Sequence, residues 1–363
     1  MTLERGGDLW PGTRRRWAVF EGGGVKGIAL IGAAEIVEAA GYAFQNLACS
    51  SAGAIIATLL AAGYSATELR PILMGLDFKQ FEDSSLLGKI PLLGQEYEIV
   101  RYLGIYDGDY FLNLIRRLLS EKLKKDKVTF RDLILPGNTE DRYRFKVHVI
   151  ASDISRGRML VLPDDIRAYG MEPEDLEVAT AVRMSMSIPF FFKPVTEKNR
   201  KGDTCYIVDG GLLSNFPIEL FDTPPPADPE WPTFGFALVP PKSMRSLDDA
   251  VEHPIHGPAT MLWAMFNTAM EAHDAYYMSQ PDVSARTIKI DNLGISATAF
   301  DLSDAQKQQL YESGQAGARE FLKTWNFEQY KSQFRGGQLD VRRQSAMSRP
   351  AATPLRDVPG GPS

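Results

Sequence analysis

The chain has 363 residues, of which 44% are hydrophobic and 24% are charged, and its formal net charge is −6. That length and apolar content support one large domain or two smaller ones with a sizeable core, and they exclude a chain that is disordered throughout. The acidic balance argues against a general nucleic-acid binder, because no global basic field is present to displace counterions.

The first elements predict a βαβ unit. Residues 1–16 form a polar lead, and the apolar stretch after it is broken after four residues by 21–24, so we expect no signal peptide and no export. Short apolar runs predict strands at 17–20 and 44–49, and each is followed by a predicted helix, at 28–40 and 52–62, with a glycine stop. This alternation predicts a parallel sheet.

The rest of the chain is less regular but continues the mixture of strands and helices. We predict helices at 109–125, 175–187, 260–278 and 304–325, and strands at 144–151, 205–208, 234–239 and 286–290. From about residue 331 onward the periodicity ends, and residues 331–363 are predicted to be a disordered basic tail. The expected fold class is α/β, with a mostly parallel central sheet flanked by helices.

The turn between the first strand and helix is Gly22-Gly23-Gly24-Val25-Lys26-Gly27. Glycines let several backbone N–H groups face one point, and the helix start adds partial positive charge, so such a turn can hold a phosphate or stabilise an oxyanion. It also matches the G-x-G-x-x-G pattern of NAD(P)-binding folds, but the acidic residue required near the end of the second strand is absent from 42–48. Dinucleotide binding and a purely structural turn are the alternatives.

The turn between the second strand and helix is Cys49-Ser50-Ser51-Ala52-Gly53. It is a nucleophile elbow of the G-x-S-x-G kind, except that Cys49 stands where the first glycine is expected. Cysteine is small and tolerates burial, so we expect a strained elbow that still forms. Ser51 is therefore a candidate nucleophile, and an ordinary helix N-cap is the alternative.

A serine nucleophile needs a base, and the histidines are poorly placed to supply one. None lies at the end of a predicted strand, where a triad histidine belongs, and none has metal-ligand spacing: His148, His253, His256 and His273. The two cysteines, Cys49 and Cys205, are too few for a disulfide framework or a four-ligand zinc site and fit a reducing compartment. By contrast, Asp209-Gly210-Gly211 ends an apolar strand, where a carboxylate is uncrowded; a turn aspartate is the alternative. We expect no metal.

Taken in order, the motifs at 21–27, 51–53 and 209–211 resemble the patatin-like phospholipase family. Supporting segments in the chain are also similar to that family: 106–109, 152–157, 185–189 and 212–217. The resemblance covers about residues 17–220. It implies a three-layer α/β/α catalytic domain at 17–222, which residues 223–330 complete or cap.

The resemblance also implies a Ser–Asp dyad without histidine. Ser51 would be the nucleophile and Asp209 the proton acceptor, with the turn at 22–27 as the oxyanion hole. Cys49 and Glu21 depart from the usual family pattern. The implied activity is hydrolysis of phospholipid or lysophospholipid esters through an acyl-enzyme, with no cofactor. A catalytically silent interaction protein of the same fold is a further alternative.

A lipid substrate requires contact with a membrane surface. No run of 18 apolar residues is present, so we expect no spanning helix. The apolar segment 86–93 and the lysines Lys122, Lys124, Lys125 and Lys127 are candidates for peripheral contact, with a core-packing loop and a solvated charged face as the alternative. The stretch 261–266 is expected to be a buried helix, with an acyl tunnel as the alternative. We expect a cytoplasmic protein, peripheral at the inner face of the membrane, without nucleic acid.

Overall fold

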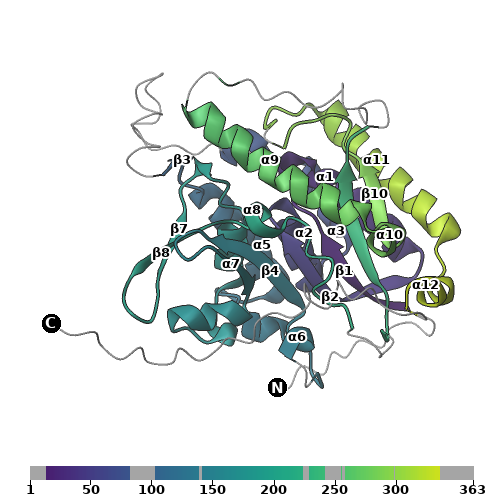
Figure 1. The fold of residues 1–363 in the computed structure, drawn as a ribbon, viewed down its shortest axis with the longest axis horizontal. Coiled ribbons are helices and arrows are strands. Elements are labelled where there is room, and N and C mark those ends of the chain that lie inside the picture. Colours follow the sequence, from purple (N-terminus) through teal and green to yellow (C-terminus); the bar gives the residue numbers. More distant parts are fainter. Residues whose placement is uncertain are drawn as a thin grey trace, which may run out of the picture.

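The computed structural model describes residues 14–81, 103–138, 141–223, 229–241, 255, 258–297 and 299–335. They form one main sheet with the strand order β10-β9-β1-β2-β4-β8-β7, and β5 pairs with β4 (Figure 1). These strands are β1 (Arg14–Phe20), β2 (Tyr42–Ser50), β4 (Val147–Asp153), β5 (Arg158–Leu162), β7 (Val195–Lys198), β8 (Thr204–Asp209), β9 (Thr233–Val239) and β10 (Thr287–Asp291). A small second sheet pairs β3 (Gly104–Tyr106) with β6 (Phe190–Phe192).

The strands from β10 to β4 pair in parallel, and the pairs β4–β5, β4–β8 and β7–β8 are antiparallel. Parallel strands are buried on both faces, which explains why their sequences read as continuous apolar runs. The predicted α/β fold with a mostly parallel sheet is confirmed.

Helices cover both faces of the sheet, as alternating side chains of β1 show. Ala18 and Phe20 pack into the core beneath α1, α2 and α11, while Trp17 and Val19 pack on the other face against residues such as Phe221. The helices are α1 (Gly27–Ala39), α2 (Ala52–Ala61), α3 (Ala66–Met74), α5 (Asp109–Leu123), α6 (Asp141–Arg144), α7 (Val178–Ser185), α8 (Gly211–Ser214), α9 (Pro258–Ser279), α10 (Pro281–Ala285), α11 (Asp304–Thr324) and α12 (Phe327–Phe334).

Three predicted elements begin three residues away from the expected position. The first strand begins at Arg14 rather than at 17, so the last three residues of the expected polar lead belong to β1. The strand expected at 144–151 begins only at Val147, because Arg144 ends α6. The helix expected at 175–187 begins at Val178, because a 3-10 turn at Pro173–Asp175 precedes it and Glu177 is extended. The short helices α3, α6, α8, α10 and α12 and the short strands β3, β5, β6 and β7 were not predicted.

Two stretches of the C-terminal region differ from expectation. Residues 331–334 belong to α12, whose start is capped by the Asn326 side chain, so the tail predicted from 331 begins too early; residues 336–363 lie outside the described residues. Within 261–266, Ala264 and Phe266 are buried but Met261 and Met265 are exposed. The prediction of a wholly buried helix is therefore wrong for the two methionines.

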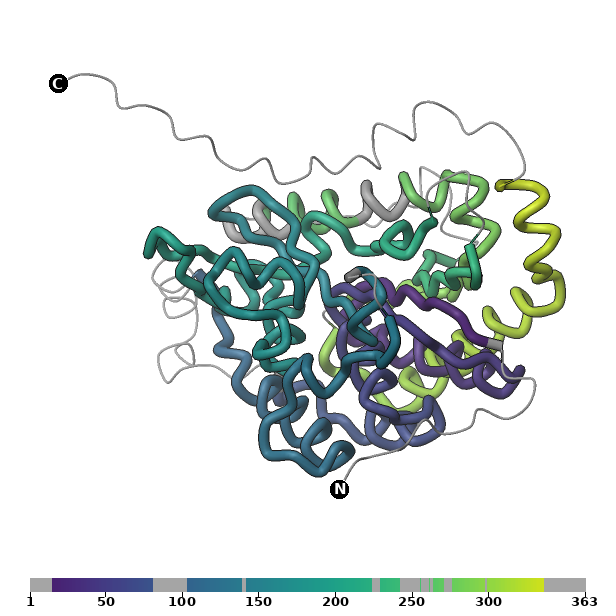
Figure 2. Tube along the Cα trace, turned by 90° about the horizontal axis from the view of Figure 1, so that it is seen from below, coloured from purple at the N-terminus to yellow at the C-terminus, as the bar shows by residue number. Residues whose placement is uncertain are grey.

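The C-terminal region shares the core of the N-terminal one. β9 lies beside β1, and α11 packs on α1, so that the last elements of the chain surround the first ones (Figure 2). A buried ion pair adds to this connection: Arg286, before β10, donates to both carboxylate oxygens of Asp222, with 2.7 Å between Nη2 and Oδ2. Arg335 approaches the same carboxylate to 3.6 Å.

Among the described helices, none is long and apolar enough to cross a membrane. The described residues also contain no group of three or more His, Cys, Asp or Glu side chains that could hold a metal ion.

Candidate active site

The ends of β2 and β8 meet along one edge of β4. Ser50, the last residue of β2, lies opposite Ile150, and Asp209, the last residue of β8, lies opposite Ala151. Because β5 pairs with the same residues of β4 as both of these strands, it occupies the other edge, and β2 and β8 share this one. The parallel β2 and the antiparallel β8 therefore point their final residues at each other, which brings Ser51 to Asp209.

Ser51 stands at a sharp turn from β2 into α2. Its backbone has φ 48° and ψ −127°, a left-handed φ that is strained for a residue with a side chain. The turn brings α2 close to the end of β1, where a Cβ on Gly53 would lie 2.4 Å from the carbonyl oxygen of Phe20. Only glycine fits there. Ala52 is the first residue of α2, so the partial positive charge of the helix N-terminus lies beside Ser51.

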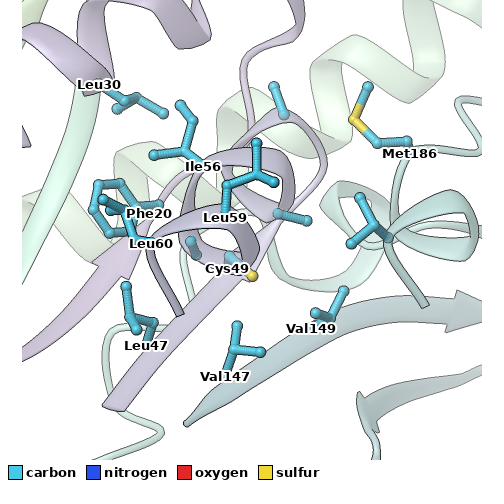
Figure 3. Packing of buried hydrophobic residues seen from close by; sticks show 14 of the residues in the cluster. Phe20, Leu30, Leu47, Cys49, Ile56, Leu59, Leu60, Val147, Val149 and Met186 are labelled. Atoms are coloured by element: carbon cyan, nitrogen blue, oxygen red, sulfur yellow. The ribbon is translucent and has the colours of Figure 1, made fainter. Parts of the chain in front are cut away.

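Cys49 fits the elbow without a glycine. Its side chain is fully buried in the main core, close to the apolar residues of α2 and β4 that surround it in Figure 3, and its thiol donates to the carbonyl oxygen of His148 at 3.3 Å. Burial raises the pKa of the Cys49 thiol well above its ordinary value, so the thiol stays neutral. Cys49 therefore acts as a core residue, and Ser50 beside it is also buried.

Asp209 holds the hydroxyl of Ser51. The Ser51 Oγ donates to Asp209 Oδ2 at 2.7 Å, and the backbone N–H of Gly211 donates to Asp209 Oδ1 at 2.7 Å. Both side chains are buried, at 2% and 0% exposure. Burial raises the pKa of Asp209 to about 7, although the hydrogen bonds from Ser51 and Gly211 lower it. A carboxylate with a pKa near neutrality can both accept and return a proton.

The glycine turn packs against this pair. A Cβ on Gly22 would lie 2.8 Å from the Cβ of Ser51. Most backbone N–H groups of the turn donate within the protein: Gly22 to Asn215 O at 3.2 Å, Val25 to Ala297 O at 3.0 Å, Lys26 to Gly23 O at 3.2 Å and Gly27 to Gly24 O. For the N–H groups of Gly23 and Gly24, the described part of the chain supplies no acceptor.

The predicted oxyanion turn 22–27 therefore offers fewer free N–H groups than expected, because those of Gly22, Val25, Lys26 and Gly27 already have acceptors. Gly23 and Gly24 remain available to an oxyanion. Gly24 has φ 58°, and a Cβ there would lie 1.9 Å from the carbonyl oxygen of Ala297, so this position accepts only glycine.

Glu21 and Asn215 fix the base of the turn. The Asn215 Nδ2 lies 3.3 Å from Glu21 Oε1 and 3.4 Å from the carbonyl oxygen of Gly22, and Glu21 Oε2 accepts from the N–H of Leu238 in β9. Glu21, Asn215 and Leu238 are all buried. Glu21 therefore joins the turn to a strand from the C-terminal part of the chain.

Sequence reasoning missed several residues of this site. The Ser51 N–H donates to Ser185 Oγ at 2.9 Å, and the Ser51 Oγ lies 3.7 Å from Met186 Sδ. Gly210 donates to the carbonyl oxygen of Ser185. The segment 185–189 was recognised as similar to a family motif, but its role in holding the elbow was not predicted, and no local signal identifies Ala297.

Of the four histidines, only His148 has a described side chain, and it does not contact the dyad. His148 is buried in β4 on the sheet face opposite α2, where its ring lies 5.9 Å from that of Phe221 and Nε2 lies 3.4 Å from Asp164 Oδ2. His253 and His256 lie outside the described residues, and His273 belongs to α9. The prediction that His148 lies within a strand is correct.

The chain is similar to known proteins in sequence and in fold. The family model for patatin-like phospholipase matches residues 18–222. Over 311 residues the chain is 37% identical to "Uncharacterized protein YqhO" of Bacillus subtilis (strain 168), an alignment that covers 85% of this chain and 98% of that protein. It is 22% identical over 202 residues to "Probable lipid hydrolase 463L" of invertebrate iridescent virus 6, covering 56% and 61% of the two chains. The solved structure of VipD from Legionella pneumophila has the same fold, with a TM-score of 0.50 and 18% identity over 86% of this chain and 67% of that one.

Proposed function

The chain belongs to the patatin-like phospholipase family, and on that premise we propose that it is a serine lipid acyl hydrolase of phospholipid or lysophospholipid esters. Membership confirms the resemblance predicted from the three motifs. The observation that carries the proposal is the 2.7 Å hydrogen bond from the strained Ser51 to the buried Asp209, beside the two available amides of the glycine turn.

In the proposed mechanism, Asp209 accepts the proton of the Ser51 hydroxyl as Oγ attacks the acyl carbonyl carbon. The oxyanion that forms accepts hydrogen bonds from the N–H groups of Gly23 and Gly24, which need no reorganisation. Asp209 then gives the proton to the leaving alcohol oxygen, and an acyl-enzyme remains on Ser51. Water attacks this ester, Asp209 takes its proton and returns it to Oγ, and the fatty acid leaves.

Two alternatives have different consequences. An NAD(P)-binding protein would use the glycine turn without Ser51 and would show NAD(P)H fluorescence changes on binding, which we do not expect. A catalytically silent protein would leave Ser51 unreactive. The Ser51–Asp209 contact favours hydrolysis over both, because neither alternative needs a serine hydroxyl held on a buried carboxylate.

The proposal is tested with a fluorophosphonate probe, which modifies activated serines, and by fatty-acid release from phosphatidylcholine and lysophosphatidylcholine vesicles. We expect the probe on Ser51 in mass spectrometry of the digested protein. Labelling and hydrolysis are expected to rise with pH through about 7, because only ionised Asp209 accepts the proton and its pKa is about 7. Unlabelled Ser51 together with absent hydrolysis would support the silent alternative.

We also propose peripheral contact with the cytoplasmic face of a membrane, through α9. This helix packs on α8, which begins two residues after Asp209. Its Met261 and Met265, one turn apart, are 52% and 59% exposed. The lysines considered for this role lie elsewhere. Lys122 pairs with Glu68 and lies next to Gly63, at the far end of α2 from Ser51, and ten residues of helix span about 15 Å.

The double variant Met261→Ser/Met265→Ser is expected to lower sedimentation with phosphatidylcholine vesicles about tenfold. Binding of the parent moves two apolar side chains from water into the membrane, and the variant loses that favourable transfer. The matched control is Lys124→Gln/Lys127→Gln, two exposed charges beyond the end of α5, which should leave sedimentation unchanged. The opposite pattern, with loss only in the lysine variant on anionic vesicles, would place the contact at the lysines. The segment 86–93 lies outside the described residues.

A further inference from the structure

A loop of the C-terminal region lies against the proposed oxyanion turn. This β10–α11 loop is described at residues 292–297 and 299–303. Because β10, β9 and β1 are successive parallel strands, their ends lie at the same edge of the sheet, and the loop begins beside the turn that follows β1. The carbonyl oxygen of Ala297 in the loop accepts from the N–H of Val25 at 3.0 Å and lies against Gly24, where a Cβ would be 1.9 Å away. The conformation of the oxyanion turn therefore depends on this loop.

The same loop also contacts the segment that lies against the nucleophile. Phe300 of the loop stacks on Phe191, with 5.0 Å between the ring centres and 19° between the ring planes. Phe300 is buried and Phe191 is half-buried. The N–H of Phe191 donates to the carbonyl oxygen of Ile188 at 3.2 Å, two residues after Met186, whose sulfur lies 3.7 Å from Ser51 Oγ. One loop thus contacts both the oxyanion turn and the segment beside Ser51.

The segment around Phe191 is held firmly on its other side. β6, which contains Phe191, pairs with β3, and the ring centre of Phe191 lies 4.6 Å from that of Tyr106. The next residue, Phe192, is buried, and the guanidinium of Arg183 lies 5.2 Å from its ring centre. Aromatic pairs and a cation over a ring both stabilise such an arrangement. Phe191 therefore offers Phe300 a fixed surface.

We propose that the Phe191–Phe300 stack is a positioning contact of the active site, which fixes the oxyanion turn relative to the nucleophile. This inference rests on the proposed hydrolase function. The stack joins a segment that contacts Ser51 to a loop that contacts Gly24. Without it, the loop loses its contact with the nucleophile side of the site, and the Gly24 amide moves with the loop. Both phenylalanines act through other residues and are therefore positioning residues.

The size of the effect follows from the role of the amides. Removing one oxyanion donor outright typically costs about 10²–10³ in kcat. A displaced amide keeps part of its hydrogen bond to the oxyanion, so loss of the stack should cost about tenfold. KM should change little, because the oxyanion forms only after the substrate has bound. The Ser51–Asp209 hydrogen bond is left in place, so the rise of activity through about pH 7 should also persist.

The experiment measures kcat and KM for p-nitrophenyl butyrate in the full chain. Each kcat is divided by the amount of Ser51 that a fluorophosphonate labels to completion, so that misfolded protein is not counted. Phe300→Ala and Phe191→Ala are each expected to lower this kcat about tenfold, with little change in KM. Because both variants break the same contact, the double variant should be no slower than the slower single variant. Phe300→Leu, which keeps an apolar side chain without the stacked ring, should also lower kcat and serves if Phe300→Ala does not fold.

The matched control is Phe321→Ala in α11. Phe321 stacks on Trp325 in the same geometry, with 5.2 Å between the ring centres and 20° between the planes. Its ring also lies 5.2 Å from that of Phe234, near the start of β9 and thus at the opposite edge of the sheet from the oxyanion turn. Phe321→Ala should lower stability but leave kcat per labelled Ser51 unchanged.

The outcomes separate the two levels of the proposal. If the parent hydrolyses the ester and both phenylalanine variants keep the parent kcat per labelled site, the stack does not position the site, although the hydrolase function stands. The same conclusion follows if the two losses multiply in the double variant, or if Phe321→Ala loses as much kcat as Phe300→Ala. If the parent hydrolyses nothing and Ser51 takes no probe, the proposed function itself fails, and this inference fails with it.

Discussion

Ser51→Ala is expected to lower kcat/KM for p-nitrophenyl butyrate by about 10⁴-fold or more, and Asp209→Asn by a similar factor. The first variant has no nucleophile, and the second has no base for the hydroxyl that now lies 2.7 Å from a carboxylate oxygen. Because the two groups act as one unit, the double variant should be no slower than the worse single variant. The measurement is p-nitrophenol release, with a control for spontaneous hydrolysis.

The fold of both variants must be shown to persist. Asp209→Asn keeps an oxygen for the Gly211 N–H and places an N–H₂ donor toward Ser51 Oγ, so we expect no loss of packing. Since burial raises the pKa of Asp209 to about 7, ionisation of this group costs native stability as the pH rises from about 4 to 7. Asp209→Asn should therefore be at least as stable as the parent at pH 8. A matched control for both properties is Ser152→Ala, a buried serine on β4 whose hydroxyl has no hydrogen-bond partner among the described residues. Hydrolysis by Asp209→Asn at the parent rate would exclude the dyad.

Asp222→Asn is expected to lower the free energy of unfolding by about 3–5 kcal/mol, because it leaves the buried Arg286 guanidinium without its carboxylate. Burial alone would lower the pKa of Arg286, but Asp222 and the neighbouring acidic groups raise it above its ordinary value, so the guanidinium stays charged. The measurement is the midpoint of urea denaturation followed by tryptophan fluorescence. The loss should be the same for activity-dead Ser51→Ala protein, since the two sites are independent.

An exposed ion pair provides the comparison. Arg131 and Asp175 lie 2.7 Å apart, but their side chains are 63% and 60% exposed, so Asp175→Asn should lower the free energy of unfolding far less than Asp222→Asn. Replacing both buried partners, in Asp222→Leu/Arg286→Met, should recover much of the loss, because no uncompensated charge remains. A cost for Asp222→Asn equal to that for Asp175→Asn would mean that water reaches the buried pair.

The elements that sequence alone predicts are those with local signals. The glycine turn, the small residues around Ser51 and the Asp209-Gly210 turn each follow an apolar strand, so their place at strand ends was foreseeable. The contact between Ser51 and Asp209, by contrast, could not be foreseen from local signals. It depends on β8 running antiparallel to β4 along the same edge as β2, beyond the point where β2 ends, and this brings together Ser51 and Asp209, which are 158 positions apart.

Long-range contacts also explain the errors at the site. Nothing near Val25 indicates that its N–H is taken by Ala297, and a carbonyl so far along the chain has no sequence signature. Asn215 was seen only as part of a supporting segment, since its role depends on Glu21 and Gly22 lying beside it. The exposed Met261 and Met265 were misjudged because a run of apolar letters does not reveal which side of a helix faces the core.

The pairing of β9 with β1 has a practical consequence for dissecting this protein. A fragment trimmed to residues 18–222 would contain every motif of the family, yet β1 would become an open edge in the middle of the original sheet. Such an edge recruits strands from other molecules, so the fragment is expected to precipitate. Asp222, its final residue, would also lose Arg286. If the trimmed protein is inactive, the cause is therefore the disrupted sheet and not the loss of a regulatory part. Insolubility of the fragment would support this interpretation.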